Sequence, residues 1–128
     1  SMVKHYSLSF PILQLTPSTQ SGLKPMPDAA GTWLVCYEED QGYTWLFAGA
    51  DIDLTNMQAG DTVEIAWDRR MESGGAYTLG PLNTYNNAQT NPWKHIGAEA
   101  SVYGMRIRAR QTAGVARSFY MEFLEGKR

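Results

Sequence analysis

Apolar residues recur at every second position in several short segments of this chain, and no segment shows the 3.6-residue period of an amphipathic helix. The clearest case is residues 62–71, where Val63, Ile65 and Trp67 share one parity. Successive side chains of a strand point to opposite faces, so these three are expected in a core. The residues expected on the solvent side are Thr62, Glu64, Ala66 and Asp68.

Turns rich in Gly, Pro, Asn and Asp separate these segments. About seven to nine strands with no helix between them predict an all-β fold, an antiparallel β-sandwich of the jelly-roll type, with an up-and-down barrel as the alternative. The length of 128 residues suits one domain over residues 3–128, since Ser1-Met2 resembles a remnant of tag cleavage. The first strand is expected at residues 3–10.

Two continuously apolar segments, residues 32–39 and 43–52, flank the turn sequence DQG. They predict a central pair of neighbouring strands. Residues 17–31 carry three of the six prolines and no periodicity, which is typical of a loop. This loop is expected to be either a mobile connection or an arm that binds a partner.

The last two strands are expected to form a hairpin whose three-residue loop ends at Gly114, because glycine can adopt a positive φ there. This register places Ile107 opposite Phe119 and Met105 opposite Met121 on one apolar face. Three arginines occupy the other face, each beside a residue of the last strand. The expected neighbours are Arg106 with Tyr120, Arg108 with Ser118 and Arg110 with Ala116.

The three arginines, called here the arginine stripe (Arg106, Arg108 and Arg110), span about 13 Å along one strand face. Their like charges repel, so compensating carboxylates are expected. Candidates at outward parity are Glu64, Asp68 and Glu122. One interpretation is a solvated face with cross-strand ion pairs. The other is an interface, shared with Tyr120, that meets acidic residues of another subunit.

Charge and composition exclude several classes of function. The net charge is −2, with 11 basic and 13 acidic residues, which argues against a nucleic-acid partner. No apolar run approaches the ~20 residues of a membrane helix, and no signal peptide is visible, so a soluble chain is expected. The single cysteine, Cys36, rules out an intrachain disulfide and is expected to be buried and unreactive.

No constellation of residues predicts catalysis, a cofactor or a metal. His5 and His95 lack the spacing of metal ligands. Asp51 and Asp53 could supply oxygens to calcium, but the loop that follows lacks the acidic pattern of a dedicated site, so a solvated pair at a strand end is favoured. The expectation is therefore a protein that is not an enzyme.

The aromatic residues suggest a second kind of function, because exposed rings can act as platforms for sugar rings. Trp33, Trp45 and Trp67 lie in apolar segments and are expected in the core. Trp93 follows a proline in a polar segment and is the best candidate for exposure, with Tyr85 near it in sequence. A carbohydrate-binding module, or a receptor-binding piece that uses Trp93 and Tyr85, is the alternative hypothesis.

Three segments, AGDTVEI, GGAYTLGPLNTYNNAQTNPWKHI and YGMRIRARQTAGVARSFYMEF, together resemble small β-rich structural proteins of tailed bacteriophages and related viruses. The resemblance covers about residues 50–124, and QTAGVARSF is its most distinctive part. The chain departs from the pattern at Asn86-Asn87 and in WDRR. The resemblance implies a virion protein, a capsid decoration or tail-associated subunit, that binds other virion proteins or copies of itself as a homo-oligomer. It carries over no functional residue.

Overall fold

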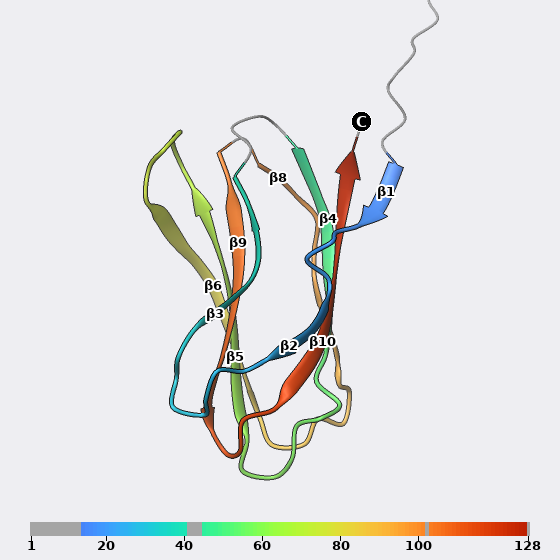
Figure 1. Ribbon diagram of the computed structural model, residues 1–128, viewed down its shortest axis with the longest axis vertical. Coiled ribbons are helices and arrows are strands. Elements are labelled where there is room, and N and C mark those ends of the chain that lie inside the picture. Colours follow the sequence, from blue (N-terminus) through green and yellow to red (C-terminus); the bar gives the residue numbers. More distant parts are fainter. Residues whose placement is uncertain (1–13, 41–44, 102, 128) are drawn as a thin grey trace, which may run out of the picture.

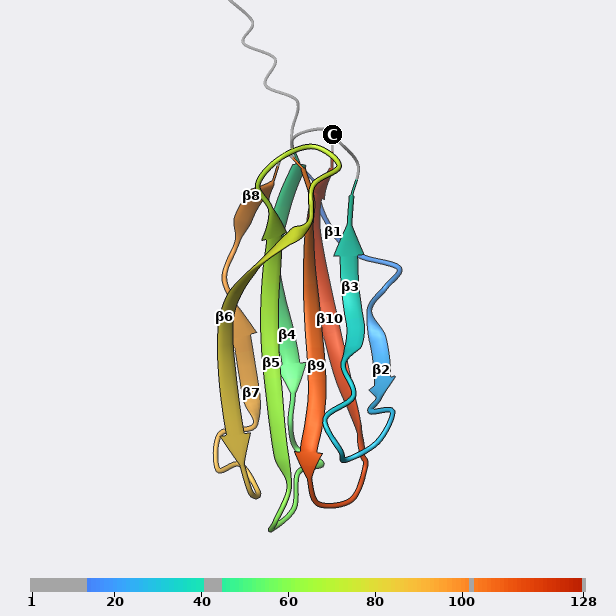
Figure 2. The same ribbon diagram turned by 90° about the vertical axis from the view of Figure 1, so that its left-hand side faces the viewer.

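Two antiparallel sheets face each other in the computed structural model, which describes residues 14–40, 45–101 and 103–127 (Figure 1, Figure 2). This arrangement confirms the predicted all-β sandwich and not the barrel alternative. Jelly-roll connectivity stays a prediction, and the expected strand at residues 3–10 lies outside the described residues.

The first sheet, sheet A, is built around its two long strands, β10 and β4. Strand β10 pairs with β4 along one edge and with β1 and β2 along the other, while β7 and β8 pair with the free edge of β4. Its strands are β1 (Gln14–Pro17), β2 (Gly22–Pro25), β4 (Trp45–Asp53), β7 (Trp93–Ile96), β8 (Glu99–Ser101) and β10 (Ser118–Lys127). The loop expected at residues 17–31 is thus wrong in part, because β2 pairs there with β10.

The second sheet, sheet B, has the strand order β3-β9-β5-β6. Its strands are β3 (Leu34–Glu39), β5 (Thr62–Arg70), β6 (Tyr77–Asn86) and β9 (Met105–Ala113). Strand β5 lies where the alternation of residues 62–71 places it. The pairing expected between residues 32–39 and 43–52 is wrong, because β3 belongs to sheet B and β4 to sheet A.

The predicted hairpin of the last two strands is also wrong, because β9 lies between β3 and β5 while β10 lies in the opposite sheet. The chain crosses between the sheets after β9 as an arch. The parity within each strand is nevertheless correct, because Met105, Ile107, Phe119 and Met121 are all buried in the core between the sheets. Two-residue alternation identifies the buried face of a strand but not the strand beside it.

The buried side chain of Gln111 holds this arch together. Its Nε2 donates hydrogen bonds to the carbonyls of Ala113 at 2.9 Å and Val115 at 2.7 Å, and its Oε1 accepts one from the Arg117 N–H at 3.1 Å. Gly114 has a φ of 90°, which confirms the expected left-handed conformation. A Cβ at Gly114 would lie 1.9 Å from Asp61 Oδ1, so no larger residue fits the turn.

The core between the sheets contains the residues that the alternation of β5 predicts. Val63 and Ile65 are buried there and Trp67 packs against them. Cys36 is buried too, and burial raises the pKa of its thiol to about 12, as expected for an unreactive cysteine. Ala66 and Asp68 were expected in solvent, but both are 2% exposed, because long side chains cover the outer face of sheet B.

Replacing Gln111 by leucine is expected to lower the free energy of unfolding by about 3 kcal/mol, because a buried backbone N–H and two carbonyls lose the side chain that bonds them. Chemical denaturation measures the change. Thr112→Val, at the next and half-buried position, is the control and should change the free energy by less than about 0.5 kcal/mol. Equal stabilities of the two variants would contradict this role of Gln111.

Candidate functional site

The arginine stripe lies on the outer face of sheet B, and its charges are compensated within the chain. Arg106 Nε and Arg108 Nε lie 2.7 Å and 2.6 Å from Asp68 Oδ2. Arg110 Nη2 lies 3.0 Å from Glu64 Oε1. Two of the three expected carboxylates are therefore confirmed. Glu122 is the wrong one, because it lies on β10 in sheet A.

Two aromatic rings cover the stripe. The Trp33 ring centre lies 4.2 Å and 4.3 Å from the guanidinium carbons of Arg108 and Arg110. The Tyr77 ring centre lies 4.2 Å from the guanidinium carbon of Arg106 and 4.4 Å from the guanidinium carbon of Arg70. The prediction that Trp33 belongs to the core is wrong, because its ring packs on arginines outside sheet B, where cation–π contacts are favourable.

Ion pairs and ring contacts together leave little of the stripe for a partner, since the Arg108 side chain is only 11% exposed. Tyr120 does not join it. Its strand pairs with β2 and β4 in sheet A, so the predicted neighbourhood of Arg106 and Tyr120 is wrong.

Asp68 is the electrostatic centre of the stripe. Its side chain is 0% exposed, and the Gly80 N–H donates a further hydrogen bond to Oδ1 at 3.3 Å. Burial opposes ionisation, but hydrogen bonds from Arg108 and Arg106 outweigh it and hold the pKa of Asp68 below its ordinary value. The carboxylate is thus ionised at neutral pH and fully engaged, which suits a structural role.

The outer face of sheet A gathers a different set of residues. Opposite residues on neighbouring antiparallel strands share a face, and the register forms two rows across β7, β4 and β10. One row is Trp93, Asp53 and Tyr120, and the next is His95, Asp51 and Glu122. We call these six residues the sheet A platform.

Trp93 is the most exposed large side chain of the platform, at 70%, and its ring is nevertheless fixed. The indole N–H donates a 2.8 Å hydrogen bond to Asp51 Oδ1, and His95 Nδ1 lies 2.9 Å from the same oxygen. The His95 ring stands edge-on to Trp93 and passes over Gly49, where a Cβ would lie 3.1 Å from His95 Cε1. Burial favours the neutral acid, but hydrogen bonds from His95 and Trp93 lower the pKa of Asp51.

Tyr120, 49% exposed, lies two strands away from Trp93, at a backbone distance of about 10 Å. Two carboxylates lie between or beside the rings. Asp53 Oδ1 accepts a 2.9 Å hydrogen bond from the Thr55 N–H. Within the described residues, Asp53 Oδ2 and the Glu122 carboxylate have no hydrogen-bond or ion-pair partner. Both are therefore available to a ligand.

The structure does not bring Trp93 and Tyr85 together. Tyr85, on β6, is half-buried and packs against the core. Lys94 Nζ lies 4.9 Å from its ring centre, and Lys94 and Trp93 are consecutive in β7, so they point to opposite faces. The ring that shares a face with Trp93 is Tyr120. The sequence signal for this site was the alternation of Asp51 and Asp53 at the end of an apolar strand.

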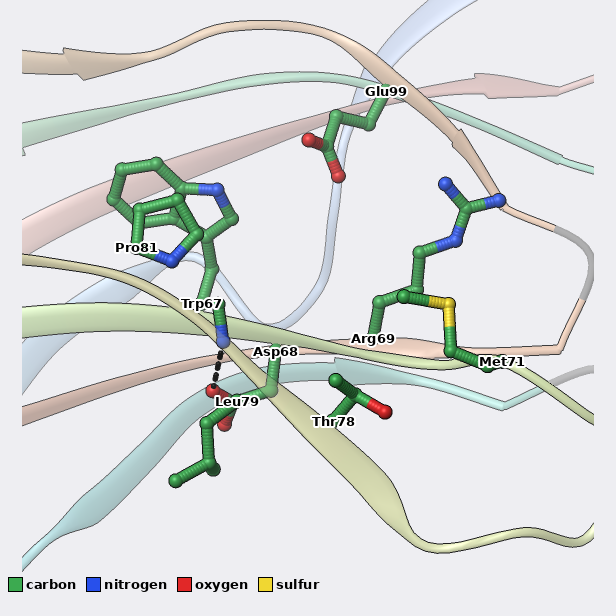
Figure 3. A pocket seen from close by; sticks show the side chains of 9 residues that line it. Trp67, Asp68, Arg69, Met71, Thr78, Leu79, Pro81 and Glu99 are labelled. Atoms are coloured by element: carbon green, nitrogen blue, oxygen red, sulfur yellow. Dashed lines mark hydrogen bonds between the residues drawn. The ribbon is translucent and has the colours of Figure 1, made fainter.

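A shallow cavity of about 170 Å³ opens at the edge of the sandwich beside β5, β6 and β8 (Figure 3). Its lining is Trp67, Asp68, Arg69, Met71, Thr78, Leu79, Gly80, Pro81 and Glu99. It contains two carboxylates, and that of Asp68 is held by two arginines.

Two features of the described part of the chain bear on other functions. No group of three or more His, Cys, Asp or Glu side chains there could hold a metal ion. No helix in that part is long and apolar enough to cross a membrane. Comparison of the chain with protein-family models, curated proteins and solved structures finds no match. The resemblance to phage structural proteins therefore stays a prediction.

Asp68→Asn is expected to lower the free energy of unfolding by about 3–5 kcal/mol, because two largely buried guanidinium groups lose their counter-charge. Denaturant unfolding at neutral pH measures the loss. Glu64→Gln is the matched control. It removes the partner of Arg110, whose side chain is 29% exposed, and should cost less than about 1 kcal/mol.

The stabilisation that Asp68 gives the folded protein should also depend on pH, and it should decrease in acid. Its pKa in the folded protein is lower than in the unfolded chain, where an aspartate titrates at about 3.9. The stabilisation is therefore complete above that value and disappears as the pH falls through the folded-state pKa. The stability gap between wild type and Asp68→Asn should narrow in acid. A gap that is constant down to the lowest pH would contradict the assignment.

Proposed function

We propose that this chain is a non-enzymatic binding module that recognises carbohydrate through the sheet A platform. One observation carries the proposal: Trp93 is 70% exposed, yet its ring is held by the Asp51 carboxylate. A mobile surface tryptophan would lose side-chain entropy on binding, whereas a ring held in place loses less. An indole combines a large apolar face with a polar edge, which suits the C–H face of a pyranose ring.

The neighbours of Trp93 supply the polar half of such a site. Sugar hydroxyls are donors, and hydrogen bonds to ionised carboxylates are stronger than those between neutral groups. Asp53 Oδ2 and the Glu122 carboxylate are free of partners in the described chain and lie between or beside the two rings. A ligand that contacts both Trp93 and Tyr120 must be longer than one sugar ring, so an oligosaccharide fits best.

A virion subunit that assembles through the arginine stripe is the second candidate. The resemblance to phage structural proteins supports it. Every arginine of the stripe already pairs with Asp68 or Glu64, so a partner would have to compete with these ion pairs. A receptor-binding piece of a phage tail that presents the sheet A platform to a glycan would combine both candidates.

Trp93→Ala is expected to lower glycan affinity at least tenfold, because a central ring carries much of the binding energy of such a site. A glycan array finds the ligand, and isothermal titration calorimetry measures the change. Leu79→Ala is the control: Leu79 is 68% exposed on β6 in sheet B, so binding should not change. Thermal unfolding should be nearly unaffected in both variants. Full binding by Trp93→Ala, or no glycan bound by the wild type, would refute the proposal.

A further inference from the structure

The sheet A platform carries an excess of negative charge. Asp51, Asp53 and Glu122 contribute three carboxylates, and His95 is the only basic residue in the two rows. The lowered pKa of Asp51 keeps that carboxylate ionised in mild acid as well. The contrast with sheet B is direct, since there Asp68 and Glu64 each have an arginine bound to them.

Two lysines on strands of sheet A, Lys94 and Lys24, face away from the platform. Lys94 lies between Trp93 and His95 in β7, but its Nζ lies over the Tyr85 ring on the opposite side of the strand. Lys24, on β2, points its Nζ toward the ring of the buried Phe123, at 5.9 Å. An acidic sugar that reached Trp93 would therefore meet these carboxylates, and neither Lys94 nor Lys24 would offset its charge.

Resting on the proposed carbohydrate function, we infer that the platform selects amino sugars with free ammonium groups, binds neutral sugars more weakly and rejects uronic and sulfated sugars. The ammonium group of a glucosamine unit stacked on Trp93 would lie within reach of Asp53 Oδ2 and Glu122. Charge-assisted hydrogen bonds and cation–π contact with the exposed rings both favour a cation there.

Three hexasaccharides distinguish the possibilities by calorimetry: glucosamine, N-acetylglucosamine and galacturonate hexamers, each titrated into the full chain. Mildly acidic pH keeps the amino groups protonated and the carboxylates ionised. The glucosamine hexamer should bind about tenfold more tightly than the neutral hexamer at low salt, if each carboxylate contributes as an exposed ion pair does. The advantage should shrink at high salt, and the galacturonate hexamer should not bind.

Glu122→Gln tests the charge without removing the ring platform. It should lower affinity for the glucosamine hexamer about threefold more than affinity for the N-acetylglucosamine hexamer, because only the former carries a cation. Glu72→Gln makes the same charge change in the exposed turn between β5 and β6 and should alter neither affinity. Equal effects of the two substitutions would overturn the role of Glu122, because they would reflect net charge alone.

The remaining outcomes separate this inference from the proposed function. Galacturonate binding as tight as glucosamine binding overturns the selectivity and leaves carbohydrate binding intact. Hexalysine binding as tight as the glucosamine hexamer overturns the assignment to a sugar and favours a cationic peptide. If no hexamer binds while the glycan array shows a neutral ligand, only the selectivity fails. If the array is blank too, both proposals fail.

Discussion

The buried carboxylate of Asp68 determines the character of sheet B. A charge with no solvent exposure is stable only when it is paired, and here Arg106 and Arg108 share it. Both guanidinium groups are thereby held at the outer face of the sheet, where the rings of Tyr77 and Trp33 pack on them. The result is a third layer of side chains outside the two sheets.

The two outer faces of the sandwich consequently differ in what they offer. On sheet B, carboxylates, guanidinium groups and rings are engaged with one another, and this face stabilises the fold. On sheet A, Asp51 holds Trp93 in an exposed position, while Asp53 and Glu122 keep unpaired carboxylate oxygens within the described chain. The same residue types thus serve stability on one face and are arranged for binding on the other. This contrast carries the proposed function.

The sequence was sufficient to predict the features that are determined by residues close together in the chain. Alternation identified the buried faces of β5, β9 and β10, and the spacing of Glu64 and Asp68 identified the partners of the arginines. Pairing of β9 with β3, and of β10 with β4, depends on packing between distant segments, so a hairpin and an arch could not be distinguished. The sequence suggested Tyr85 and not Tyr120 as the partner of Trp93 for the same reason. Trp93 and Tyr120 share a face only because β4 lies between β7 and β10. Because Trp33 lies in an apolar segment, the sequence predicted it in the core and not over the arginine stripe.

Mapping a bound oligosaccharide by nuclear magnetic resonance tests the central claim most directly. In a titration of ¹⁵N-labelled protein with the glucosamine hexamer, the account predicts the largest shifts at the Trp93 indole N–H and the amides of Asp51, Asp53 and Tyr120. The Trp33 indole N–H, over the arginine stripe, should not move. Shifts centred on Trp33 and the stripe, or no shifts at saturating sugar, would contradict the account.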